Sequence, residues 1–265
     1  MLTTHDTHAP IGAGSDGAAN DDPARIGFDA PFRWLKLGAD DMVKTRFAGV
    51  VYGLVFAAMG LALSAIYASH WQLTMGLTAG FFLMGPFVCA GVYELSRQLE
   101  RGEPISLPKS AMCWMRNPGS IGFFAAMLTF AMIVWARVSI VIFALFSTTD
   151  FPTLQGVLSQ IFSLQNYEFV AVWMGIGFVF ASIVFAISVV SVPMMLDRDT
   201  DGVVAVLTSL RAFGGSVPAM IVWALLIVLL VGLGFALAFA GLVVAVPVIG
   251  HATWHAYRAL VAPPG

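Results

Sequence analysis

The chain has 265 residues, of which 59% are hydrophobic and 11% charged, and its mean hydropathy is +0.87. Soluble domains carry about 45–50% apolar and about 25% charged residues, so a water-exposed fold could not bury these side chains and a lipid bilayer must accommodate them. The net charge of −2 provides no basic surface for phosphate backbones, which excludes nucleic acid as an expected partner.

The N-terminal segment, residues 1–30, nearly lacks large apolar side chains. It cannot bury enough surface to offset its ordering entropy, so we expect a disordered cytoplasmic tail there and a transmembrane domain over residues 31–261. The segment also lacks the basic start and apolar centre of a signal peptide. Of the two cysteines, Cys89 lies in an apolar run and Cys113 in a segment expected on the cytoplasmic side, which makes a disulfide unexpected.

Runs of 18 or more apolar residues predict membrane spans, because about 20 helical residues cross a hydrocarbon layer of about 30 Å. The apolar stretch from Pro218 to Leu260 is twice too long for one crossing, and Gly232 and Gly234 permit a turn near Gly232–Leu237. The sequence therefore predicts an all-α membrane protein of about six transmembrane helices. The expected spans are Ala48–Ala68, Trp71–Leu95, Ile121–Phe146, Phe169–Leu196, Pro218–Val231 and Ala238–Tyr257.

The basic residues predict the orientation. Twelve of the 13 Lys and Arg residues fall on one side of a six-span arrangement, and the opposite connections contain none. The positive-inside rule then places both termini in the cytoplasm of a bacterial inner membrane protein.

A weak internal repeat accompanies the spans. Each pair of spans follows a short amphipathic segment, and the second span of each pair carries a proline, at Pro86, Pro193 or Pro247. Three copies of an interfacial helix followed by a helical hairpin would account for six spans. The amphipathic segments are Phe32–Phe47, Leu107–Asn117 and Asp201–Phe213.

Two histidines near the C-terminus form the first candidate site. His251 and His255 are four residues apart and share one helix face, so they could hold a metal or haem if a third ligand came close. The segment His251–Arg258 is also typical of an interfacial belt that anchors a helix end in water and headgroups. We favour the belt and expect no metal and no cofactor.

Glu94, Arg97 and Asp201 are polar residues for which we expect structural roles, and pairs of glycines are expected to serve helix packing. Glu94 and Arg97, at i and i+3, are expected to pair with each other, with substrate binding by Glu94 as the alternative. Asp201 is expected to cap the following helix by accepting from the amide of Val203 or Val204. Gly49 and Gly53 provide a smooth helix face, as do Gly76 and Gly80, for packing within the bundle or for a homodimer.

Arg137 is the one basic residue well within an expected span. Its guanidinium could snorkel to the outer interface, or it could face the bundle and pair with Glu168 or Asp150. In the second case Arg137 would be the best candidate for a functional polar contact with an anionic solute or a partner.

The chain resembles a family of proteobacterial integral membrane proteins known as a domain of unknown function, some of whose members are labelled cytochrome c oxidase subunit I. The resemblance covers nearly everything after Pro31 and implies a multi-span membrane protein without assigned catalytic residues. An oxidase core needs several histidines within its spans, and this chain offers only His251 and His255. The matching stretches are Trp34–Asp40, Tyr52–Phe56, Gly85–Phe87, Gly91–Arg97 and Ile249–Arg258.

The sequence lacks the common motifs of soluble enzymes. The chain contains no Gly-x-Ser-x-Gly, phosphate loop, His-Glu-x-x-His or Cys-x-x-Cys motif. We therefore expect a non-catalytic inner-membrane protein that helps to assemble, or packs against, a larger membrane complex, which could be respiratory. The alternative is a transporter or channel for a small or lipid-like solute. The sequence leaves the oligomeric state open.

Overall fold

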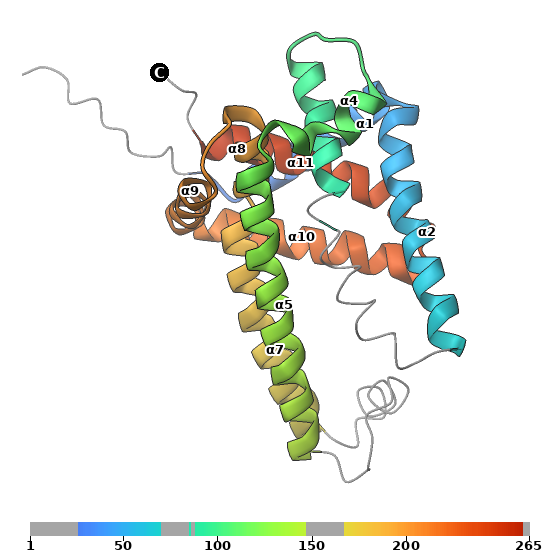
Figure 1. Ribbon diagram of the computed structural model, residues 1–265, viewed down its shortest axis with the longest axis vertical. Coiled ribbons are helices and arrows are strands. Elements are labelled where there is room, and N and C mark those ends of the chain that lie inside the picture. The colour runs from blue at the N-terminus through green and yellow to red at the C-terminus, as the bar shows by residue number, and fades with distance from the viewer. Residues whose placement is uncertain (1–25, 70–84, 86–87, 147–166, 262–265) are drawn as a thin grey trace, which may run out of the picture.

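The computed structural model describes residues 26–69, 85, 88–146 and 167–261, and that part of the chain is helical without any strand (Figure 1). One helix, which covers residues 88–100, carries no label and is named by these residues below. The other elements in chain order are α1 (Ala30–Thr45), α2 (Phe47–Ser69), α4 (Leu107–Ala111), η1 (Cys113–Arg116), α5 (Pro118–Phe146), α7 (Tyr167–Ser188), α8 (Ser191–Arg198), α9 (Gly202–Gly215), α10 (Val217–Ala236) and α11 (Leu242–Leu260).

Within the described residues, four stretches are long and apolar enough to cross a membrane: Phe47–Ile66, Pro118–Phe146, Tyr167–Arg198 and Val217–Ala236. This confirms the all-α membrane fold. The expected span Trp71–Leu95 lies mostly outside the described residues, and α11 is not among the four stretches. The count of six spans therefore stays a prediction, as do the tail over residues 1–30 and the three-fold repeat.

The three amphipathic segments form helices, as predicted. They correspond to α1, to α4 with η1, and to α9, and each of them is followed by one of the four apolar stretches. Asp201 caps α9 as expected, because its carboxylate accepts from the amide of Val203 at 2.8 Å.

Helix α11 packs between α1 and α2, and glycines bring the three backbones together. A Cβ on Gly38 of α1 would lie 2.6 Å from the carbonyl oxygen of Val248. A Cβ on Gly53 of α2 would lie 2.2 Å from the carbonyl oxygen of Val243, closer than any carbon atom could come. The Gly49–Gly53 pair therefore serves packing within the molecule, as predicted. Gly76 and Gly80 lie outside the described residues.

The turn between α10 and α11 corrects one expectation. Gly232 and Gly234 were expected to form this turn, but α10 continues through both glycines to Ala236. The chain reverses afterwards, at Ala238 and Phe239, which adopt positive φ angles of 51° and 67°. Gly234 instead permits close packing, because a Cβ there would lie 2.4 Å from the side chain of Leu242.

The expected span Phe169–Leu196 is divided into two helices. Helix α7 ends at Ser188, and α8 begins at Ser191. Pro193 explains the break, because it has no amide hydrogen for the carbonyl of Val189, four residues earlier. Helix α8 then buries Met194, Met195 and Leu196 inside the protein.

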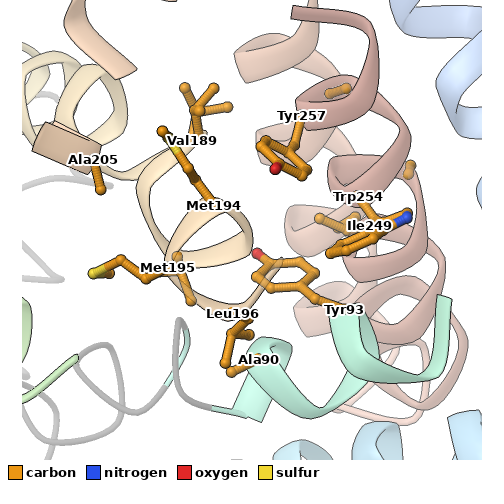
Figure 2. Packing of buried hydrophobic residues seen from close by; sticks show 14 of the residues in the cluster. Ala90, Tyr93, Val189, Met194, Met195, Leu196, Ala205, Ile249, Trp254 and Tyr257 are labelled. Carbon is orange, nitrogen blue, oxygen red and sulfur yellow. The ribbon is translucent and has the colours of Figure 1, made fainter. Parts of the chain in front are cut away.

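These α8 side chains lie in the main hydrophobic core (Figure 2). Figure 2 shows the Tyr93 ring of the helix at 88–100 between α8 and α11, which contributes Trp254 and Tyr257. Helix α8 thereby fixes the relative positions of two helices that carry the polar residues described below.

Helices α5 and α7 form an antiparallel hairpin that projects from this core (Figure 1, green and yellow). Figure 1 also shows α10 running across the direction of the hairpin, so α10 does not cover it along its length. In the most apolar 18-residue segment of α5, 12% of the residues are buried, and the share is 6% for the Tyr167–Arg198 stretch. The corresponding share for α2 is 33%. Most of the apolar surface of the hairpin is therefore left uncovered by the other described residues.

Candidate functional site

A buried polar cluster joins α1, the helix at 88–100 and α11. Helix α1 contributes Asp41 and Thr45, which continue the buried stripe begun by Trp34 and Gly38. The spacing of three and four residues places all four side chains on the face of α1 that packs against α11.

His251 of α11 is fully buried in this cluster, and both of its ring nitrogens have partners. Thr45 Oγ1 donates to the carbonyl of Asp41 at 3.0 Å, so it accepts from His251 Nε2 at 3.2 Å. His251 Nδ1 lies 2.6 Å from the hydroxyl of Ser96, which is also 3.5 Å from Asp41 Oδ2. This arrangement satisfies a neutral imidazole, and hydroxyl groups occupy both positions that a metal would use.

His255, one helical turn further along α11, contacts the same acidic residue. Its Nε2 lies 2.8 Å from Asp41 Oδ2, and the imidazole remains partly exposed. Burial would raise the pKa of Asp41, but the hydrogen bond with His255 and the charges of His255 and Lys44 outweigh it and lower this pKa below its ordinary value. Asp41 is therefore an ionised acceptor that connects α1 to α11.

The structure corrects the expectation of a wet interfacial belt at the end of α11. His251, Trp254 and Tyr257 are buried inside the protein rather than exposed to headgroups. Their environment is provided by α1, the helix at 88–100 and α8. The expectation that neither histidine holds a metal stays a prediction.

A second polar cluster surrounds Glu94, whose predicted pairing with Arg97 is confirmed. Arg97 donates through Nε and Nη2 at 2.7 and 2.9 Å. Arg116, at the end of η1, donates two further bonds to the same carboxylate at 2.9 and 3.1 Å. Two guanidinium groups thus hold one fully buried carboxylate, which ties η1 to the helix at 88–100.

A third cluster lies at the ends of α8 and α11. Asp197 accepts from the hydroxyl of Tyr257 at 2.8 Å and from Nη1 of Arg258 at 3.3 Å. Arg258 also donates to Glu100 at 2.9 and 2.6 Å, and Glu100 accepts from the indole of Trp254 at 3.1 Å. The three clusters together connect α1, α8, α11, η1 and the helix at 88–100.

Sequence reasoning missed most partners of the candidate residues. Asp41 and Thr45 carried a usable signal, because they lie at helical spacing on the buried stripe of α1. Ser96 carried none, since a serine at the end of an apolar run has many ordinary roles.

The structure does not bring Arg137 and Glu168 together. Both side chains are exposed on the α5–α7 hairpin, and within the described residues no ion pair joins them. Asp150, the other expected partner, lies outside the described residues. The hairpin nevertheless has internal aromatic packing, because Trp135 contacts Trp173 and Phe180 at centroid distances of 5.7 and 5.4 Å.

Comparison with known proteins relates the central part of the chain to a protein family. Residues 73–197 match the model of a family described as a predicted integral membrane protein (DUF2189). No curated protein and no solved structure matches the chain. The matched stretch contains Glu94, Arg97, Arg137, Glu168 and Asp197, whereas α1 and α11 lie outside it. The chain is thus an integral membrane protein whose central part is similar to a family of predicted integral membrane proteins of unknown function.

Proposed function

We propose that the chain is a non-catalytic accessory or assembly protein of the bacterial inner membrane, and that it binds another integral membrane protein through the α5–α7 hairpin. One observation carries the proposal. Arg137 is exposed in the middle of an apolar helix face that the rest of the described protein does not cover.

The face is defined by Phe130, Ile133, Arg137 and Val141, which we call the Arg137 stripe. Spacings of three and four residues place these side chains on one side of α5. The three apolar members are 68%, 55% and 58% exposed. The hydrocarbon of a bilayer would accommodate the three apolar side chains, but the charge of Arg137 needs a polar partner or access to the headgroups.

A charge at this position is costly. An arginine costs about 2.5–3.5 kcal/mol on insertion scales at the centre of a membrane helix and less toward its ends, and Arg137 lies between the centre and the end of α5 (Pro118–Phe146). Such residues usually pair with a carboxylate or face a polar space. Within the described residues Arg137 has no acidic partner, and we propose that an acidic residue on a neighbouring membrane helix pairs with it. Snorkelling to lipid headgroups is the competing explanation, and the experiment separates the two.

The polar clusters support a non-catalytic role. His251, Glu94 and Asp197 each bond to side chains of other helices, and these bonds connect elements of the fold. Catalysis requires polar groups that converge on a reacting atom. The clusters instead stabilise the body from which the hairpin projects.

The test is site-specific photocrosslinking in native membranes. A photoreactive residue at Ile133 or Val141 should give one discrete protein adduct, identified by mass spectrometry as a membrane protein with an acidic residue in a span. The matched controls are Leu225 and Leu229, which are exposed and apolar on α10. Adducts with lipid alone at all four positions would contradict the proposal.

A further inference from the structure

A hollow of about 510 Å³ opens where the helix at 88–100, α4, η1 and α8 meet. Its floor includes the apolar side chains of Met195 and Leu196. Charged side chains form the rest of its lining, and they come from segments that the Glu94 and Asp197 clusters hold in place. The charged residues are Arg97, Arg101, Glu103, Lys109, Arg116, Asp197 and Asp199.

The basic side chains of the hollow are matched in number by acidic ones, but the pairing between them is uneven. Glu94 lies beneath the hollow and pairs with both Arg97 and Arg116, so two positive charges share one negative charge. Arg97 uses Nε and Nη2 for these bonds, which leaves Nη1 without a protein acceptor among the described residues. The Arg97 side chain is only 6% exposed, so its position in the lining is fixed.

Arg101 is the least constrained cation of the hollow. Its only ion pair within the described part of the chain is a long one, 3.8 Å to Asp197, and that carboxylate already accepts from Tyr257 and Arg258. Lys109, in contrast, is paired with Glu103. The positive charge available to a ligand is therefore concentrated on Arg97, Arg101 and Arg116.

The surface beside the hollow has the character of a membrane interface. Met112, Trp114 and Met115 flank or belong to η1, next to Arg116, and they are 62%, 49% and 58% exposed. Tryptophan beside apolar and basic side chains is typical of the headgroup level of a bilayer. A ligand in the hollow would thus lie at the depth of lipid headgroups.

We propose that the hollow binds the phosphodiester group of a membrane phospholipid. A guanidinium group binds phosphate oxygens through two parallel hydrogen bonds, and Arg101 can provide both donors. Arg97 adds its remaining donor, Nη1, and Arg116 adds positive charge. Asp199 also lines the hollow and has no ion-pair partner among the described residues, so it would repel a second negative charge. This favours a singly charged phosphodiester over inorganic phosphate. The apolar floor accommodates the glycerol and the first acyl carbons.

The experiment uses the full chain, purified and delipidated in detergent, with phosphatidylglycerol, diacylglycerol or inorganic phosphate added. Thermal unfolding and native mass spectrometry report binding. Phosphatidylglycerol should raise the melting temperature and remain bound as a discrete adduct, whereas diacylglycerol and inorganic phosphate should do neither. Arg101→Gln should weaken phosphatidylglycerol binding roughly tenfold, the expected effect of losing one charge-assisted contact.

Arg211→Gln is the matched control, because Arg211 is exposed on α9 and does not line the hollow. It should bind phosphatidylglycerol as the wild type does, and Arg101→Lys should retain part of the binding. Equal binding by Arg101→Gln and the wild type would overturn the proposal. Equal stabilisation by diacylglycerol would show that phosphate is not recognised, and equal stabilisation by inorganic phosphate would exclude a lipid as the specific ligand.

Discussion

Ser96 Oγ lies 2.6 Å from His251 Nδ1, and this buried hydrogen bond joins two residues that are 155 positions apart in the chain. Together with the contact of Thr45 on the other ring nitrogen, it fixes the imidazole between three helices. His251 therefore acts as a structural connection in the fold.

Removing this connection should destabilise the protein. His251→Ala removes one hydrogen-bond partner from each of the hydroxyls of Ser96 and Thr45 in a buried site, which costs about 1–3 kcal/mol. The melting temperature in detergent should fall. His251→Ala combined with Ser96→Ala should lose less than the sum of the single variants, because both remove the same interaction.

Thr208→Ala is a control for these variants, because Thr208 is partly exposed and, among the described residues, bonds to the carbonyl of Val204 in its own helix. It should leave the melting temperature nearly unchanged. The metal content of His251→Gln/His255→Gln should equal that of the wild type. Loss of a stoichiometric metal in this double variant would show that the histidines are ligands.

The Asp41–His255 pair predicts a pH dependence. Burial opposes the ionised form of Asp41, but its hydrogen bond with His255 and the neighbouring positive charges lower its pKa below the ordinary value of 3.8. A lowered pKa means that the ionised carboxylate stabilises the fold above pH 3.8 and that this contribution is lost as the pH falls through the folded-state pKa. Asp41→Asn should therefore be less stable than the wild type at pH 7, and the difference should shrink below pH 4. A constant difference between pH 7 and pH 3 would refute this explanation.

The close approach of α2 and α11 predicts that Gly53 does not tolerate a side chain. Gly53→Ala would place a Cβ 2.2 Å from the carbonyl oxygen of Val243, so the helices must separate. The expected result is a loss of the monodisperse peak in detergent, measured by fluorescence-detected size exclusion. Gly122→Ala, where a Cβ on α5 would meet nothing within 4 Å, should elute as the wild type does.

The orientation can be tested with single cysteines in a Cys89→Ala/Cys113→Ala background. Tyr167 and Leu237 are exposed at helix ends expected outside the cell, and Met112 is exposed on the expected cytoplasmic side. Tyr167→Cys and Leu237→Cys should react with an impermeant thiol reagent in intact cells, whereas Met112→Cys should react only after lysis. The reverse pattern would place the basic residues outside.

Composition and local patterns predicted the helices but not the contacts between them. Apolar length and the absence of charge were sufficient for α2, α5 and α10, and Asp201 marked the start of α9. The break at Pro193 was missed, because proline is also tolerated inside membrane helices. The hydrogen bond between Ser96 and His251 depends on how α11 packs against the helix at 88–100. That packing joins segments far apart in the chain, so no local sequence pattern reveals it.

The exposed charge on the hairpin is the most direct test of the account. In native membranes that carry the photocrosslinker at Ile133, the yield of the partner adduct should be measured for Arg137→Lys and Arg137→Leu. We predict that Arg137→Lys retains the adduct and that Arg137→Leu loses most of it, while both variants keep the melting temperature of the wild type. An adduct of undiminished yield from Arg137→Leu, or no protein adduct in the wild type, would contradict binding through this charge.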